Sequence, residues 1–262
     1  MVWSIWDVGE CGCEAEADCS QWESDNPSVP VVSLPIDDDF SSDTSGNYTA
    51  NMFLGTLGSV SVASGQLRIS VTPSSFAGLY RSQFEVYRYI HLPIAGMSTM
   101  TLRGRLGTLS HGGAINLSEY RLQYGEGVGG LFMNNSISWN LANRQTTSVP
   151  LGEAYFDPDA NLSGRTQTDT YAAAEDSDIL FEMIATNNGS NEYTSVMKMW
   201  HSGVLKSTLT FATAYEDTIR VVDHNTYGLA GCGHFVRMYF DVTSDASGSH
   251  LFYVDDLEVS WT

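Results

Sequence analysis

Short alternating runs of hydrophobic and polar residues, separated by turn residues, dominate the chain from Phe40 onward. In Gln66–Val71 and Met100–Arg105 apolar and polar residues alternate, and this period of two predicts a strand with one buried face. Similar runs occupy Ser59–Val62, Tyr120–Tyr124, Ile137–Leu141, Ile179–Ile184, Tyr193–Trp200, Leu205–Phe211, Thr218–Val222, His234–Val242 and Leu251–Trp261. No long stretch carries the 3.6-residue period of a helix. The pattern therefore predicts an all-β chain of about twelve to fifteen strands.

Residues 1–35 depart from this pattern. They carry three tryptophans and three prolines, which are Trp3, Trp6, Trp22, Pro27, Pro30 and Pro35. Prolines disfavour regular structure because they lack a backbone N–H donor and fix φ. We therefore expect two parts: an N-terminal arm over 1–35 that anchors the chain or contacts a partner, and one β-sandwich over 36–262. The alternative is an arm that packs on its own domain.

Three of the four cysteines, Cys11, Cys13 and Cys19, lie in this arm. Their spacing matches no common zinc pattern, and no second ligand pair accompanies them. Three alternatives stay open for them: a disulfide or crosslink, a metal site, and free thiols.

The charge balance limits the function classes. The chain has 31 acidic and 12 basic residues, with a net charge of −19. Phosphate contacts need a basic face, so we expect no nucleic-acid partner. No apolar run approaches the roughly 20 residues of a membrane span. The first residues lack the basic and apolar regions of a signal peptide, which suggests an intracellular protein, a trimmed secreted protein or a virus protein released by lysis.

Four short motifs resemble the concanavalin A-like lectin/glucanase (LamG-like) jelly-roll family. They are the acidic opening Ile36–Ser42, the strand Ser64–Ile69, the hairpin Met197–Leu205 and the acidic closing strand Leu251–Trp261. The resemblance covers roughly residues 36–262. It implies a sandwich of two antiparallel sheets in which the first and last strands are neighbours. Laminarin-type glucanases, polysaccharide lyases and many carbohydrate-binding modules share this sandwich.

The same resemblance implies a structural calcium position where the first and last strands meet. Its candidate ligands are Asp38, Asp39, Asp255 and Asp256. Calcium takes several oxygen ligands, which carboxylates and backbone carbonyls supply. The alternative is a set of hydrogen-bonded aspartates that close the sheet ends. The six histidines show no HxxxH or HxH spacing, which argues against a catalytic metal centre.

One strand offers a candidate contact surface. The run Arg81–Val86 resembles the R-S-E-L-x-E strand of alginate lyases, with Gln83 in place of an acid. Alternation places six residues on one face of this strand: Arg81, Gln83, Glu85, Tyr87, Tyr89 and His91. Such a strip would bind an acidic sugar or a partner protein, and the alternative is a plain solvated face.

The resemblance to catalytic families is incomplete. The E-x-D-x-x-E strand of laminarinases is missing, as are the Q-I-H tripeptide and the Y-F-K-x-G-x-Y strand of the lyases. We therefore predict no catalytic residue.

These observations favour a non-catalytic structural or adhesion protein on a virion surface, such as a bacteriophage capsid decoration, tail or fibre protein. Its partners would be other virion proteins, further copies of itself, or a glycan at the host surface. The alternative is a secreted carbohydrate-binding module or a diverged polysaccharide lyase. Aromatic side chains would then stack on sugar rings, with Tyr87, Tyr89, Tyr124, Trp139 and Trp200 as candidates.

Overall fold

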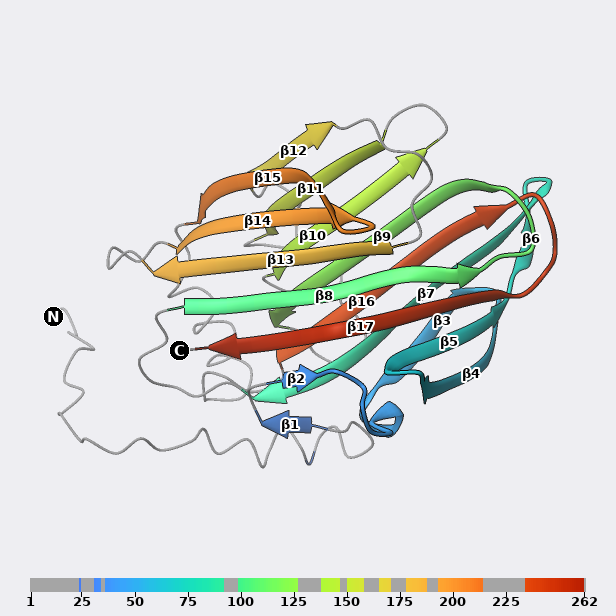
Figure 1. Cartoon of the computed structure of the whole chain (residues 1–262), viewed down its shortest axis with the longest axis horizontal. Helices are drawn as coiled ribbons and strands as arrows, with labels where there is room; N and C mark the ends of the chain where they lie inside the picture. The colour runs from blue at the N-terminus through green and yellow to red at the C-terminus, as the bar shows by residue number, and fades with distance from the viewer. Residues whose placement is uncertain are drawn as a thin grey trace, which may run out of the picture.

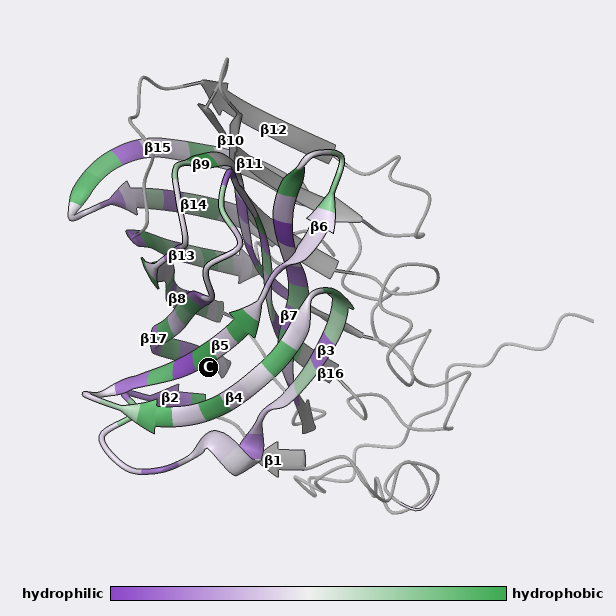
Figure 2. Ribbon diagram, turned by 90° about the vertical axis from the view of Figure 1, so that its right-hand side faces the viewer, coloured by the Kyte–Doolittle hydropathy of each residue, from purple (hydrophilic) through white to green (hydrophobic). Residues whose placement is uncertain are grey.

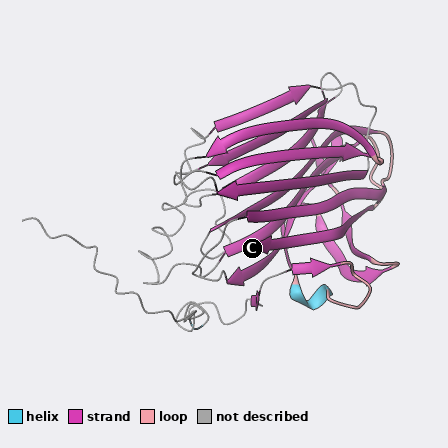
Figure 3. Cartoon of the chain, turned by 60° about the vertical axis from the view of Figure 1, so that its left-hand side comes forward, coloured by secondary structure: helices cyan, strands magenta, loops and turns pink. Residues whose placement is uncertain are grey.

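The computed structural model describes residues 24, 31–33, 36–91, 99–126, 138–146, 150–157, 165–170, 178–187, 193–213 and 234–261. These ranges form two stacked β-sheets (Figure 1) and one short 3₁₀ helix, η1 (Ser45–Asn47). Strands make up almost everything else that is described (Figure 3). The predicted fold class, an all-β concanavalin A-like jelly-roll sandwich of two antiparallel sheets, is confirmed. No helix among the described residues is long and apolar enough to cross a membrane.

The first sheet has nine strands within the described ranges. In spatial order they are β1 (Val31–Ser33), β7 (Leu79–His91), β16 (His234–Ser244), β9 (Ile115–Glu126), β10 (Ser138–Thr146), β11 (Pro150–Asp157) and β12 (Arg165–Thr170), while β3 (Thr49–Leu54) and β6 (Ser74–Phe76) also pair with β7. Strand β1 is the last piece of the predicted arm, and it pairs with β7 in parallel. The predicted strand Thr218–Val222 lies outside the described residues.

Among the described residues the second sheet has eight strands. In spatial order they are β15 (Val204–Thr213), β14 (Tyr193–His201), β13 (Asp178–Asn187), β8 (Thr99–Ser110), β17 (His250–Trp261), β5 (Gln66–Thr72) and β4 (Thr56–Ala63), while β2 (Ile36–Asp38) also pairs with β17. The β2–β17 pairing is antiparallel and sets Asp38 opposite Leu257. The expected neighbourhood of the first and last strands of the domain is therefore present.

The core lies between the sheets and follows the alternation in the sequence, which Figure 2 shows as coloured bands along the long strands. Strand β7 buries Phe84 and Val86, while its neighbour β16 buries Phe240. The rings of Phe84 and Phe240 stack at 4.9 Å, and Phe252 of the opposite sheet packs edge-on against Phe84 at the same distance. Residues between these inward positions face away from the core, so the nine-stranded sheet presents an outer face of polar side chains.

Candidate functional site

Three strands that are far apart in sequence meet on the outer face of the nine-stranded sheet. Strand β16 lies between β7 and β9 (Figure 1). The register aligns their outward positions in three rows: Tyr87–Arg237–Gln123, Glu85–Tyr239–Arg121 and Gln83–Asp241–Glu119. Cross-strand neighbours of this kind contact one another directly. The rows therefore form one continuous polar network.

The Arg237 cluster, made of Asn51, Glu85, Gln123 and Arg237, is the buried part of this network. Arg237 donates from Nη1 to Glu85 Oε2 at 2.9 Å and from Nε to Gln123 Oε1. Asn51 donates to the other oxygen of Glu85 at 3.1 Å. Glu85 is 0% exposed and Arg237 is 3% exposed. Burial raises the pKa of Glu85, and the charge of Arg237 partly offsets that rise. The cluster is a fixed, mutually satisfied unit.

The other part of the network is more accessible. Arg81 forms a two-pronged ion pair with Asp241, in which Nε donates to Oδ1 at 2.7 Å. These hydrogen bonds raise the pKa of Arg81, whose side chain is 20% exposed. Gln83 donates to the hydroxyl of Tyr239, and Arg121 pairs with Glu119. Burial raises the pKa of Tyr239, so its hydroxyl stays protonated at neutral pH.

Two exposed aromatic rings border this accessible part. Phe53 is 50% exposed and lies 6.3 Å from the ring of Tyr239, centroid to centroid. Phe76 is 45% exposed, and the guanidinium of Arg81 lies over its ring at 4.9 Å. We name this area the open end and define it by Phe53, Phe76, Arg81, Gln83, Arg121 and Tyr239. Apolar rings beside oriented polar groups are the composition of a ligand-contact surface.

The strip that the sequence predicted is only one edge of this surface. Arg81, Gln83 and Glu85 join the network, and Tyr87 is half-buried at its end. The backbone of Tyr89 and His91 belongs to β7, but their side chains lie outside the described residues. The side chains of Tyr124 and Trp139 lie outside them too, and Trp200 is on the eight-stranded sheet.

Sequence analysis did not identify Phe53, Phe76, Arg121 and Tyr239 as site residues. They come from four different strands, β3, β6, β9 and β16. Alternation predicts which face of β16 Tyr239 occupies and which face of β9 Arg121 occupies. It could not show that the two strands are neighbours.

The predicted calcium ligand Asp38 is the centre of a buried corner of the protein. Its carboxylate accepts hydrogen bonds from Phe40 N at 3.0 Å, Thr44 Oγ1 at 2.8 Å and Tyr48 OH at 2.9 Å. Arg88 adds an ion pair at 3.8 Å. Burial and the Asp38 charge raise the pKa of Tyr48. Asp38 therefore stabilises the segment that follows β2, up to Tyr48.

The other three predicted ligands have different partners. Asp39 is exposed and accepts from Ser41 N, Asp255 accepts from Asp256 N, and Asp256 pairs with Arg105 at 3.3 Å. In the described part of the chain no three or more His, Cys, Asp or Glu side chains are grouped to hold a metal. Calcium at these aspartates stays a prediction, which melting curves with and without a chelator check. Cys11, Cys13 and Cys19 lie outside the described residues.

No protein-family model and no curated protein matches the chain. Solved structures do resemble its fold. A variant of alginate lyase Aly36B in complex with alginate trisaccharide is 12% identical, with a TM-score of 0.45 over 87% of this chain and 98% of that one. The laminarinase catalytic domain of Thermotoga petrophila RKU-1 is 10% identical, with a TM-score of 0.44 over 87% and 96%.

A lectin fold is among the similar structures as well. The legume lectin-like domain of Entamoeba histolytica is 11% identical, with a TM-score of 0.44 over 82% of this chain and 89% of that one. At these identities the likeness extends to the fold alone.

Proposed function

We propose that this chain is a non-catalytic, lectin-like binding protein whose open end contacts glycans. The observation that carries the proposal is the pair of half-exposed rings, Phe53 and Phe76, beside oriented polar groups of the network. Sugar rings have apolar C–H faces and polar rims. An aromatic side chain can cover the first while Gln83 and Arg121 bond to the second.

The hydrogen bonding of the network supports binding rather than catalysis. Sugar cleavage needs a group that gives or takes a proton during the reaction. Glu85 is held by Arg237 and Asn51, Asp241 is held by Arg81, and the Tyr239 hydroxyl accepts from Gln83. Each of these groups already has a partner within the protein, so proton transfer to a substrate would first have to break the network.

The proposal extends to where the protein works. A sandwich that carries an acidic surface and a tryptophan- and cysteine-rich arm suits a virion surface component, with residues 1–35 docking on other virion proteins or on further copies of the chain. The alternative is a secreted carbohydrate-binding module or a diverged polysaccharide lyase. Gradient sedimentation of the native source material, with mass spectrometry of the fractions, separates the two. Co-migration with virus-sized particles supports the virion location, and recovery as a free protein contradicts it.

Glycan binding itself is tested by affinity electrophoresis of the full chain through gels that contain polysaccharides. Phe53→Ala should weaken binding about fivefold, since one aromatic contact is worth about 1 kcal/mol. The matched control is Val204→Ala, because Val204 is 56% exposed on the other sheet. Binding to no polysaccharide would contradict the proposal, and so would an equal loss in both variants. Shortening of the polymer during the run would show that the protein is an enzyme.

A further inference from the structure

The charges cancel among the described outward side chains of β7, β16 and β9, the three strands under the open end. Among the described outward side chains of β7, β16 and β9 there are three cations and three anions, and they form three pairs. The pairs are Arg81–Asp241, Arg121–Glu119 and Arg237–Glu85. The described strands β3 and β6, which border the open end, contribute no charged residue. Each arginine that an acidic sugar would seek therefore already holds a carboxylate.

Exchange of these carboxylates for a ligand anion is unfavourable. Asp241 is 2% exposed and Glu85 is 0% exposed, so an incoming acid that took their arginine would leave a buried charge without its partner. The pair of Arg81 with Asp241 is also two-pronged, the strongest geometry for such a pair. In addition, a chain of net charge −19 repels a polyanion at long range.

A neutral sugar meets none of these obstacles. The exposed rings of Phe53 and Phe76 offer apolar contact without any change in protonation or pairing. Arg81 and Arg121 each have five N–H groups, more than the carboxylates of Asp241 and Glu119 bond. The remaining N–H groups can donate to sugar hydroxyls.

We infer that the open end is selective for neutral glycans over acidic ones, and that the three internal ion pairs are the reason. The inference rests on the proposed glycan-binding function and names its ligand class. The predicted strip along β7, for which an acidic sugar, a partner protein or plain solvent were the alternatives, then supports a surface of aromatic and hydroxyl-bonding groups in which Arg81 is neutralised by Asp241.

Affinity electrophoresis of the full chain at 0.15 M NaCl, about physiological ionic strength, tests the selectivity. The probes are two neutral polysaccharides, laminarin and galactomannan, and two acidic ones, alginate and polygalacturonate. We expect retardation by at least one neutral polymer and by neither acidic polymer. Retardation by the acidic polymers overturns the selectivity but leaves glycan binding in place. Retardation by none of the four overturns glycan binding and the selectivity with it.

A second variant tests the ion pairs as the cause. Glu119→Gln removes the carboxylate partner of Arg121 at the accessible end of the network. We expect this variant to gain at least tenfold in affinity for alginate. The matched control is Glu182→Gln, because Glu182 lies 4.0 Å from Lys198 on the opposite face of the molecule. No gain in Glu119→Gln, or an equal gain in both variants, overturns the role of the pairs.

Discussion

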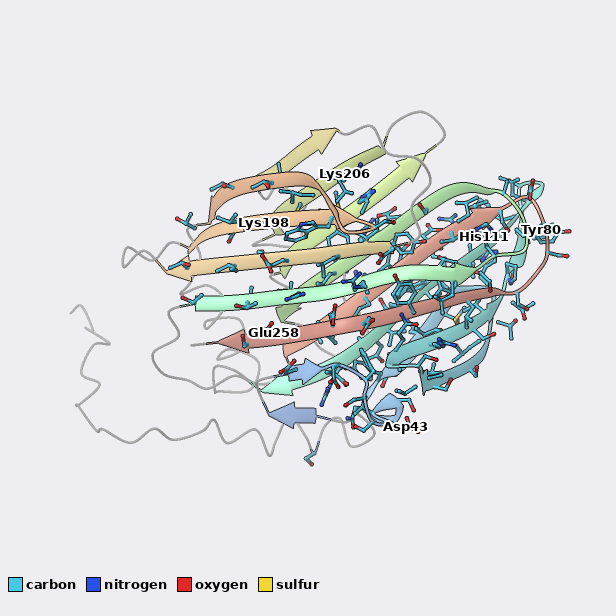
Figure 4. All side chains as sticks on the ribbon, viewed as in Figure 1. Asp43, Tyr80, His111, Lys198, Lys206 and Glu258 are labelled. Carbon is cyan, nitrogen blue, oxygen red and sulfur yellow. The ribbon has the colours of Figure 1, made fainter. Side chains whose placement is uncertain are left out.

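Both outer faces of the sandwich carry ion pairs of a basic and an acidic side chain, but they bury these pairs to different extents. On the nine-stranded sheet, Arg237 and Glu85 meet at 2.9 Å with side chains 4% and 0% exposed. On the eight-stranded sheet, Lys198 and Glu182 lie 4.0 Å apart and are 43% and 25% exposed. Lys198 and Glu258 mark this second face in Figure 4.

The difference shows on which face the side chains are held in position before any ligand binds. Exposed ion pairs contribute about 0–1 kcal/mol to the free energy of folding, because water and salt screen them. Buried and fully bonded pairs cannot lose one member without a large penalty. The network on the nine-stranded sheet therefore holds its side chains in fixed positions, as a ligand-contact surface requires. The Lys198–Glu182 pair on the other face is accessible to water, which screens it.

Removal of one buried charge is the strongest test of this contrast. Arg237→Ala should lower the free energy of unfolding by about 3–5 kcal/mol, because Glu85 then stays buried without its partner. Arg105→Ala is the matched control: Arg105 pairs with Asp178 at 3.5 Å and with Asp256 at 3.3 Å on the solvated face, and about 1 kcal/mol or less is expected there. Guanidinium chloride titrations measure both. Equal losses would show that the two faces are not different.

The core between the faces holds a group that responds to pH. His250 is fully buried, with Nδ1 3.0 Å from Ser82 Oγ and Nε2 3.0 Å from Ser244 Oγ. Burial, aided by the nearby His111, lowers the pKa of His250 to about 4. The unfolded chain, with a histidine pKa of about 6.5, therefore takes up this proton first.

It follows that the folded state loses stability as pH falls from about 6.5 toward 4. The measurement is the free energy of unfolding at several pH values, for the natural chain and for His250→Asn. The difference between the two should shrink as the pH is lowered. A constant difference would mean that the pKa of His250 is the same in the folded and the unfolded chain.

A change in ion-pair geometry at the open end should lower the free energy of unfolding less than loss of a buried charge at the Arg237 cluster does. Arg81→Lys keeps the charge but loses the two-pronged contact with Asp241. We expect a loss of roughly 1.5–3 kcal/mol in the free energy of unfolding, as for one hydrogen bond to a charged group. Thermal unfolding followed by circular dichroism is suitable. A loss as large as that of Arg237→Ala would show that the whole network is equally rigid.

The smallest effect belongs to the solvated face. Lys198→Ala should change the free energy of unfolding by less than about 0.5 kcal/mol, and the change should disappear at 1 M salt, where the Debye length is about 3 Å. Unfolding at low and high salt measures it. A larger, salt-independent loss would show that Lys198 acts through packing of its alkyl chain.

Asp38 shows how much a local sequence motif can predict. The acidic opening of the domain correctly placed Asp38 at a strand end beside the last strand. Its carboxylate contacts Thr44 and Tyr48, which are 6 and 10 residues away, and the ion pair with Arg88 comes from another sheet. The motif could not distinguish this set of partners from a set of calcium ligands, because both use the same aspartate at the same strand end.

The sequence by itself determined most of the long strands, their inward and outward faces and the net charge of −19, because alternation with a period of two is a local property of the chain. It missed β3, β11 and β12, so the described residues hold 17 strands where about twelve to fifteen were predicted. Only the tertiary structure decided the site. Arg81 and Asp241 are 160 residues apart, and Arg237 and Glu85 are 152 apart. Their pairing depends on strand order and register, which place β16 between β7 and β9. Each strand encodes which face a side chain occupies, but packing of the whole sandwich selects the partner across from it.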